Sequence, residues 1–198
     1  MHNQPITYVA VLAGGRSSRM GRDKRYIRLG GESLLDRTLR VVAQVAGGGL
    51  ERIYICGDVA NYSCLKDEVS GLGPLSGVLS AMRQARAQGS HLAQLLVLPI
   101  DMPLLDSDLL SQLIEHHRLD EGHGATRYVD SEMPFVLTVS EHTQKIVEEL
   151  CTQSDGRSRS VRNLLERVSS KNIGCPSHNQ RLTTNLNHPQ DLENMVAR

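Results

Sequence analysis

Aromatic residues are scarce in this chain, and neither sign of charge is in excess. Only 3% of its 198 residues are aromatic, with no tryptophan and a single phenylalanine, Phe135. The core must therefore be aliphatic, and stacking platforms for single-stranded nucleic acid are not expected. Lysine plus arginine and aspartate plus glutamate each total 22, so the formal net charge is zero. This balance argues against a general binder of nucleic acid or membrane surfaces, which would be basic.

Paired cysteines and long apolar runs are also missing. The four cysteines include no C-x-x-C pair, so the sequence supports neither a zinc site nor a redox dithiol. We expect Cys56 to be a small buried apolar residue. Residues 1–5 are polar and no apolar run approaches 18 residues, which argues against a signal peptide and a spanning helix. The sequence thus predicts a cytoplasmic protein with reduced thiols and no membrane association.

The most informative segment is residues 11–24, V-L-A-G-G-R-S-S-R-M-G-R-D-K, which directly follows an apolar stretch. Gly14 and Gly15 have no Cβ, so the backbone can turn sharply and bring its N–H groups close to an anion. Arg16, Arg19 and Lys24 can add charge-assisted hydrogen bonds to phosphate oxygens. The segment therefore predicts a loop that holds a polyphosphate after the first strand.

A simple turn is the alternative for a Gly-Gly pair after a strand. The four cations between residues 16 and 24 favour the phosphate-binding interpretation, because a turn does not need them. The loop matches neither common nucleotide motif. Lys24 is followed by Arg25 instead of serine or threonine, and Gly14 and Gly15 are adjacent instead of spaced as G-x-G.

Strands and helices alternate along the chain, which predicts βαβ units around a mostly parallel sheet in an α/β protein. No linker or repeat interrupts the pattern, so we expect one domain over residues 1–198. Ser33 and Ser107 are the expected N-caps of two helices. The expected strands are 6–13, 52–56, 92–100, 124–127, 135–139 and 182–186, and the expected helices are 33–45, 78–88, 107–118, 141–150, 160–168 and 189–196.

Asp101 follows the most apolar of these strands, in the sequence L-P-I-D-M-P. Ligands of open α/β sheets bind at the carboxyl ends of the strands, which is where the glycine-rich loop also lies. A carboxylate beside phosphates needs a cation between them, so Asp101 is a candidate Mg²⁺ ligand. The alternative is that Asp101 only caps the turn before Pro103.

Two further segments lie where strands give way to helices. Residues 73–77, G-P-L-S-G, would allow a flat ring to approach the backbone, although the segment taken alone favours a tight turn before a helix. Asn187 offers an oxygen to a hard cation, but it could equally be the N-cap of the last helix, with Pro189 in the first turn. Each segment is thus a candidate whose structural alternative stays open.

Together these four segments resemble the molybdenum cofactor guanylyltransferase family of MobA-like nucleotidyltransferases. The family motif L-A-G-G-x-S-x-R-M-G-x-D-K is present at residues 12–24, G-P-L-x-G at 73–77, D-x-P at 101–103 and N-x-N-x-P-x-x-L at 185–192. The likeness covers nearly the full length, and its motifs keep the family's order and spacing. It implies a three-layer αβα, Rossmann-like nucleotidyltransferase fold.

The resemblance also implies a reaction, in which GTP and a molybdopterin-type phosphomonoester give a guanine dinucleotide cofactor and pyrophosphate. Arg19 and Lys24 would neutralise the triphosphate, and Asp101 with Asn187 would hold Mg²⁺. Relatives that use CTP tend to have alanine at position 14, so Gly14 favours guanine, the larger base. The implied nucleotide-binding residues are Leu12, Ala13, Gly14, Gly15, Lys24, Asp67, Gly73, Pro74 and Asp101.

The acceptor side is less specific. Arg157, Arg159 and Arg162 are candidates for the phosphate of the pterin substrate, and a solvated basic face explains them equally well. Two alternatives to guanylyl transfer remain. One is a related nucleotidyltransferase of the cytidylyl or sugar-phosphate type, and the other is a non-catalytic nucleotide-binding adapter. Such an adapter would not need both Lys24 and Asp101. Transient contact with molybdoenzyme-maturation proteins is a further expectation from the resemblance.

Overall fold

A computed structural model of the chain describes residues 4–14, 23–47, 49–65, 73–89, 92–120, 122–175, 182, 184–186, 190–191 and 195. Its centre is a seven-stranded sheet with the strand order β5-β4-β1-β6-β8-β7-β9. The strands are β1 (Ile6–Leu12), β4 (Ile53–Cys56), β5 (Cys64–Leu65), β6 (Ala93–Pro99), β7 (Ala125–Tyr128), β8 (Phe135–Val139) and β9 (Ser170–Ile173). A short hairpin, β2 (Arg28–Leu29) with β3 (Glu32–Ser33), stands apart from this sheet.

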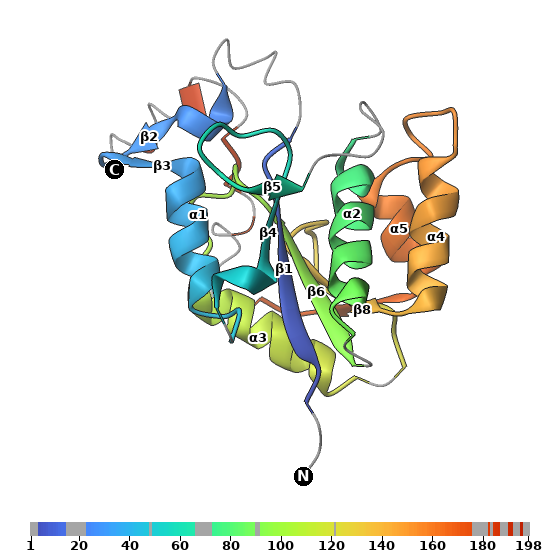
Figure 1. The fold of residues 1–198 in the computed structure, drawn as a ribbon. Coiled ribbons are helices and arrows are strands. Elements are labelled where there is room, and N and C mark those ends of the chain that lie inside the picture. Colours follow the sequence, from blue (N-terminus) through green and yellow to red (C-terminus); the bar gives the residue numbers. More distant parts are fainter. Residues whose placement is uncertain are drawn as a thin grey trace.

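Five helices cover the two faces of the sheet and complete three layers (Figure 1). They are α1 (Leu34–Ala43), α2 (Pro74–Ala87), α3 (Ser107–Arg118), α4 (Glu141–Cys151) and α5 (Val161–Arg167). One apolar cluster joins α1 and α3 to one face, and a second joins α2, α4 and α5 to the other. The expected three-layer α/β architecture is therefore confirmed.

The sheet is mostly parallel, as predicted, but β8 reverses its direction. β1 pairs in parallel with β4 and β6, β4 with β5, and β7 with β9. β8 is antiparallel to both β6 and β7. Because β8 alone runs backwards, the carboxyl ends of the other six strands share one edge of the sheet, and β8 begins at that edge.

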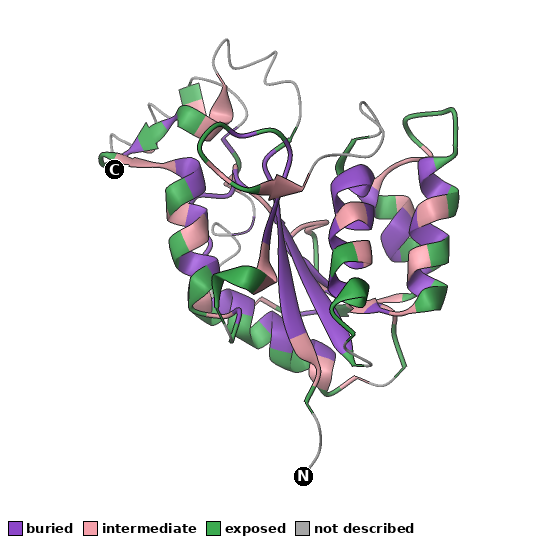
Figure 2. Cartoon of the chain, viewed as in Figure 1, coloured by how far each residue is buried: buried purple, intermediate pink, exposed green. Residues whose placement is uncertain are grey.

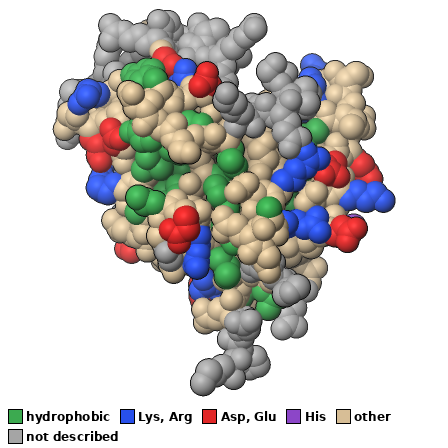
Figure 3. Space-filling view, in the orientation of Figure 1, with side chains coloured by type: hydrophobic (Ala, Val, Ile, Leu, Met, Phe, Trp, Pro, Cys, Tyr) green, Lys and Arg blue, Asp and Glu red, His purple; other side chains and the backbone are tan. Residues whose placement is uncertain are grey.

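The central strands are buried on both sides, which explains why their sequences are almost continuously apolar. In β1, Tyr8 and Ala10 pack with the α2 layer, whereas Val9 and Val11 pack with the α1 layer. Figure 2 shows β1 and β6 as buried along most of their length. On the face in Figure 3, acidic and basic side chains are interspersed, in keeping with the neutral composition.

Helix starts match the sequence expectations in part. Ser33 is the N-cap of α1, since its side chain accepts a hydrogen bond from the amide of Asp36. The expectation that Ser107 caps α3 is wrong: Asp106 is the cap and accepts from the amide of Leu109 at 3.0 Å. Asp is as good a cap as Ser, and Asp106 is one residue earlier.

The helix expected from Val78 begins four residues earlier, at Pro74. Proline suits the first turn of a helix because its missing N–H would have no partner there. The preceding residue, Gly73, has φ of 75°, a conformation that side-chain-bearing residues rarely adopt. Most of the G-P-L-S-G segment is therefore helix, and Gly73 supplies the turn before it.

The carboxyl-terminal third differs most from expectation. The short strand β9 was not predicted, because S-K-N-I offers only one apolar side chain to a sheet. The strand expected at 182–186 is not formed by the residues described there, 182 and 184–186. Within the expected last helix, residues 190, 191 and 195 are helical. None of the helices that the described residues form combines the length and the apolarity needed to cross a membrane.

Candidate functional site

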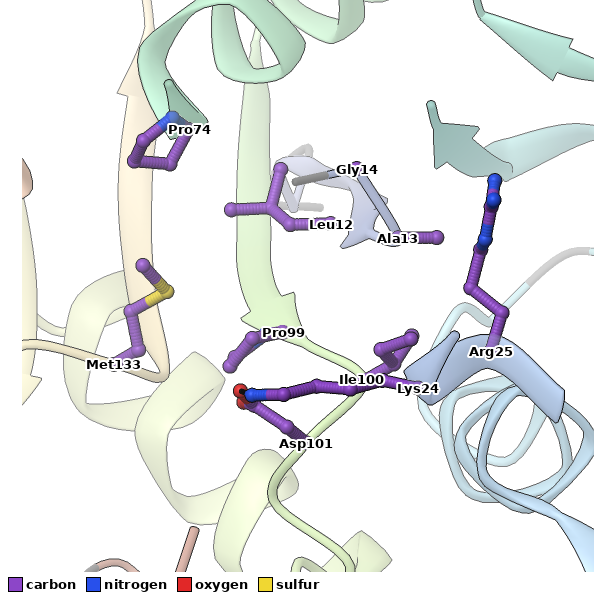
Figure 4. A pocket seen from close by; sticks show the side chains of 10 residues that line it. All are labelled: Leu12, Ala13, Gly14, Lys24, Arg25, Pro74, Pro99, Ile100, Asp101 and Met133. Atoms are coloured by element: carbon purple, nitrogen blue, oxygen red, sulfur yellow. Dashed lines mark hydrogen bonds and ion pairs between the residues drawn. The ribbon is translucent and has the colours of Figure 1, made fainter. Parts of the chain in front are cut away.

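A cavity of about 230 Å³ lies where β1 and β6 end, at the shared carboxyl edge of the sheet. Figure 4 shows its walls, which come from the end of β1, the short 3-10 helix Lys24–Tyr26, the first turn of α2, the end of β6 with the residues after it, and the segment before β8. The lining residues are Leu12, Ala13, Gly14, Lys24, Arg25, Pro74, Pro99, Ile100, Asp101 and Met133.

Lys24 and Asp101 meet in this cavity although 77 positions separate them in the sequence. Lys24 Nζ lies 2.8 Å from Asp101 Oδ2, and the two side chains are 18% and 22% exposed. The glycine-rich segment and the D-x-P segment therefore share one site, as the sequence predicts. Asp101 directs its carboxylate at Lys24, while the helix that follows it is capped by Asp106.

The start of the glycine-rich loop is held against β4. The Ala13 amide donates to the carbonyl of Cys56 at 2.9 Å, which extends the ladder one residue beyond β1. A Cβ added to Gly14 would lie 3.7 Å from the nearest protein atom outside its chain neighbours, the carbonyl oxygen of Cys56. Among the described residues there is thus room for alanine at this position.

The first turn of α2 faces the same cavity. Pro74 lines it, and Gly77 lies one turn further along the helix. A Cβ on Gly77 would lie 2.8 Å from Cys56 Cβ and 3.1 Å from Leu12 Cδ2. Gly77 therefore lets α2 pack closely on β1 and β4, which places Pro74 beside the end of β1.

The carboxyl-terminal segment also reaches this site. The Leu186 amide donates to the carbonyl oxygen of Asp101 at 2.9 Å. The Leu186 side chain is fully buried in a cluster with Ile27, Leu29 and Leu34. The segment 184–186 is thus fixed next to Asp101, and Asn187, the candidate metal ligand, follows it in the chain.

Several predicted site residues lie outside the described residues: Gly15, Arg19, Asp67 and Asn187, together with Arg16. Their roles stay predictions. Of the remaining candidates, the cavity brings together Leu12, Ala13, Gly14, Lys24, Pro74 and Asp101, and Gly73 directly precedes Pro74. Six of the predicted site residues therefore line one cavity at this edge of the sheet.

The sequence did not single out Arg25 or Met133, which also line the cavity. Arg25 Nε donates to both carboxylate oxygens of Asp23, at 2.7 and 2.8 Å. Hydrogen bonding by Arg25 holds the pKa of the Asp23 carboxyl below its usual value. The signal for Arg25 was its place directly after the D-K pair, whereas Met133 reaches the site only because β8 begins at this edge.

The arginines expected near an acceptor lie in and before α5. Arg162 Nε donates to Glu132 Oε1 at 2.9 Å, and the Arg162 side chain is 72% exposed. Both residues line a second cavity, of about 420 Å³. Glu132 is the chain neighbour of Met133, so one short segment borders both cavities. Arg157 is exposed and Arg159 is half-buried.

All four cysteines are described and none forms a disulfide, and Cys56 is buried, as predicted. Among the described residues, no three or more His, Cys, Asp or Glu side chains gather in a way that could hold a metal ion. A metal at this cavity would therefore find a single described carboxylate, that of Asp101.

Comparison with known proteins gives consistent results. A family model described as "MobA-like NTP transferase domain" matches residues 9–172. The chain is 30% identical over 196 residues to the molybdenum cofactor guanylyltransferase of Rhizobium johnstonii, covering 92% of this chain and 88% of the relative. It is 28% identical over 186 residues to the enzyme of the same name from Xanthomonas euvesicatoria, covering 94% and 92%.

Solved structures share the fold. The molybdopterin-guanine dinucleotide biosynthesis protein A of Archaeoglobus fulgidus superposes with a TM-score of 0.72 at 22% sequence identity, covering 96% of this chain and 97% of that one. A cytidylyltransferase from Leptospira borgpetersenii superposes with a TM-score of 0.65 at 14% identity, covering 98% and 86%. One architecture thus serves relatives whose names specify different nucleotides.

Proposed function

Because this chain belongs to the MobA-like NTP transferase family, we propose that it transfers GMP from GTP to the phosphate of a molybdopterin-type acceptor. The products are a guanine dinucleotide cofactor and pyrophosphate. The observation that carries this proposal is the meeting of Lys24 with Asp101 in a cavity at the carboxyl edge of the sheet. A nucleotidyltransferase needs cationic and metal-binding groups side by side, and these two are in contact.

In this proposal, the end of β1 and the start of α2 hold the nucleotide. Leu12, Ala13 and Gly14 supply backbone and a small apolar wall, and Pro74 supplies the facing wall. Lys24 binds triphosphate oxygens, aided by Arg19. Gly15, Asp67 and Gly73 complete the nucleotide-binding set that the resemblance implies.

We further propose that the enzyme uses Mg²⁺, held by Asp101 and Asn187. Mg²⁺ binds proteins through one or two ligands and takes the rest from phosphate oxygens and water. A single described carboxylate in the cavity fits this habit, and a cage of several acidic residues would not. The hydrogen bond between Leu186 and Asp101 supports the second ligand, because Leu186 is the chain neighbour of Asn187. When bound, the ion supplies charge neutralisation at the phosphates.

The chemistry requires positioning and charge neutralisation, and it requires no protein nucleophile. An oxygen of the acceptor phosphate attacks the α-phosphorus of GTP, and the bond to the bridging oxygen of pyrophosphate breaks. The attacking group is already an anion at neutral pH, so no strong base is needed. Lys24 lines the cavity, which supports the proposal that its ammonium group binds the negative charge of the triphosphate.

The direct test is pyrophosphate release from GTP in the presence of Mg²⁺ and a molybdopterin source. Asp101→Ala should lower the rate by about a hundredfold or more, since it removes the carboxylate proposed to hold the Mg²⁺ that neutralises charge in the transition state. Glu141→Ala is the matched control: it removes an exposed carboxylate at the opposite edge of the sheet, where α4 begins, and should leave the rate unchanged. Tight binding of GTP without turnover would instead favour an adapter.

A binding screen tests the choice of base independently. A ligand that binds only the folded state raises the melting temperature by mass action. Among the four nucleoside triphosphates with Mg²⁺, GTP should give the largest rise. A larger rise with CTP would contradict the guanylyl assignment while leaving the nucleotidyltransferase class intact.

A further inference from the structure

The turn that follows β4, residues Gly57 and Asp58, touches the glycine-rich loop at two places. Neither residue lines the nucleotide cavity. One contact lies before the segment 15–22 in the chain and the other lies after it. The two contacts are of different kinds and are independent of each other.

The first contact is a close approach of two backbones. Gly57 has φ of 137°, which L residues with side chains rarely adopt. A Cβ on Gly57 would lie 2.8 Å from the Gly14 nitrogen and 3.1 Å from both the carbonyl carbon of Ala13 and the Cα of Gly14. These are backbone atoms, so they cannot rotate away as the end of a flexible side chain would. Any side chain at position 57 must displace the peptide that joins Ala13 to Gly14.

The turn itself is held in place on its other side. The Gly57 amide donates to the carbonyl of Leu65 in β5 at 3.1 Å, and the carbonyl of Cys56 accepts from Ala13 at 2.9 Å. Gly57 is therefore wedged between the edge strand and the end of β1. A displacement at this point is transmitted to Gly14, because Leu65 restrains the opposite side.

The second contact comes from Arg25. Its guanidinium donates from Nη1 to the carbonyl oxygen of Asp58. The same guanidinium is fixed by Asp23, to which it donates from Nε. Figure 4 shows Arg25 and Lys24 extending in different directions, with Lys24 reaching Asp101. Residues 23–25 are thus fixed on one side by the turn and on the other by Asp101.

We propose that the Gly57–Asp58 turn positions the nucleotide-binding loop, setting its first amides through the approach of Gly57 to Gly14 and its last residues through the bond from Arg25 to Asp58. Gly57 and Asp58 act through Gly14 and Arg25, so they are positioning residues, whereas Arg25 also lines the cavity itself. The role rests on the proposed binding of a nucleoside triphosphate at this loop. The close approach to Gly14 explains why position 57 is glycine, which the formation of β4 alone would not require.

Gly57→Ala tests the proposal, with Gly89→Ala as the matched control. Gly89 also has positive φ, 76°, but a Cβ there meets no atom of the described residues within 4 Å, and Gly89 follows the end of α2. Both variants carry the backbone strain of alanine at positive φ, and only Gly57→Ala also displaces Gly14. We expect Gly57→Ala to raise the dissociation constant and the KM for Mg·GTP by about tenfold or more. Gly89→Ala should stay within twofold of the wild type.

Arg25→Lys tests the second contact and does not depend on Gly57→Ala folding. It keeps the positive charge at the cavity but loses the fork that joins Asp23 to Asp58. We expect the KM for Mg·GTP to rise several-fold. A merely structural role would lower the fraction of active protein and leave KM unchanged. Wild-type affinity for GTP in folded Gly57→Ala or in Arg25→Lys would overturn the proposal.

A measurement without nucleotide separates this proposal from the proposed function. Amide hydrogen exchange in peptides covering residues 8–14 and 23–29 should be faster in Gly57→Ala than in Gly89→Ala and the wild type. Equal exchange in all three proteins would overturn the positioning role even if the wild type binds GTP. If Gly57→Ala exchanges faster but the wild type binds no nucleotide, the positioning role is supported. The proposal that GTP is the donor of GMP is then contradicted.

Discussion

At the scale of single residues, Gly14 has room for a Cβ among the residues that the structure describes, yet the sequence has glycine there. If glycine makes space for the larger base, Gly14→Ala should lower kcat/KM for GTP by about tenfold while affecting CTP less, since one methyl group in a pocket costs roughly 1–3 kcal/mol. The measurement is kcat/KM for both nucleotides in the variant and the wild type. Because the nearest protein atom is 3.7 Å away, a loss of folding is not expected to interfere. An unchanged ratio of the two constants would refute the size argument.

The ion pair between Lys24 and Asp101 gives a second prediction at this scale. Each group neutralises the other, so a nucleotide must take Lys24 away from Asp101. In EDTA, Asp101→Asn should therefore bind GTP more tightly than the wild type, by about 1 kcal/mol or roughly fivefold for a partly exposed pair. With Mg²⁺ the order should reverse. Isothermal titration calorimetry under both conditions measures the change.

Simple removal of a negative charge would also strengthen binding, and a double-mutant cycle separates the two causes. In a Lys24→Met background, release of Lys24 no longer contributes, so the gain from Asp101→Asn should shrink. An equal gain in both backgrounds would show that the ion pair does not restrain Lys24.

The sequence predicted some residues of the site and missed others, depending on which interactions bring each residue to the cavity. Lys24 and Asp101 were expected to meet because each follows a strand that ends at the same edge. Arg25 and Met133 were not expected, since their positions depend on the Gly57–Asp58 turn and on the direction of β8. Such contacts are set by tertiary packing, and no periodicity in the sequence encodes them.

At the scale of elements, the packing of α2 on β1 and β4 depends on Gly77. Alanine is the better helix former, by about 1 kcal/mol. Its Cβ would nevertheless lie 2.8 Å from Cys56 Cβ, and such overpacking costs roughly 1–3 kcal/mol. We expect Gly77→Ala to lower the melting temperature by a few degrees and to weaken GTP binding, because Leu12 is the other neighbour. Differential scanning calorimetry measures the first effect, with Gly14→Ala as a glycine control that has room. A more stable Gly77→Ala protein would contradict this account.

Helices and long strands were predicted well because their apolar patterns are strong, a stripe at helical spacing in α1 and a nearly continuous run in β6. Their starts were less accurate where two good signals compete. Asp106 and Ser107 are both good caps, and Pro74 fits either a turn or a first helical position. β9 has little apolar pattern of its own, because a short edge strand is specified by its partner, β7.

At the scale of the whole molecule, the buried His117 links α3 to the sheet and should make stability depend on pH. Its ring nitrogens lie 3.0 Å from Thr126 Oγ1 and 3.1 Å from Thr138 Oγ1. Burial lowers the pKa of His117 to about 4, from an ordinary value near 6.5. The unfolded chain therefore binds a proton that the folded protein resists. This contribution to stability is fully present above pH 6.5 and is lost as the pH falls from 6.5 to about 4.

The size of the loss is about 3 kcal/mol over that interval. Urea unfolding at a series of pH values measures it. His117→Gln should flatten the dependence between pH 6.5 and 4, whereas His116→Gln, at an exposed position on the same helix, should not. Identical pH dependence in the wild type and His117→Gln would show that another group is responsible.

The overall architecture was predicted because alternating strands and helices have few ways to pack. The reversal of β8 was not predicted, because the sequence of a strand does not show whether it pairs parallel or antiparallel with its neighbours. That reversal brings the segment 131–133 to the edge where the nucleotide cavity lies, and Met133 lines that cavity.

The hydrogen bond from Leu186 to Asp101 has a consequence for biosynthesis. Domains begin to fold from the N-terminal side while the chain is still being made. The sheet can form before residue 186 leaves the ribosome. The hydrogen bond from the Leu186 amide to the Asp101 carbonyl can form only afterwards. The site is thus expected to be incomplete on the nascent chain until residue 186 has left the ribosome and this hydrogen bond has formed.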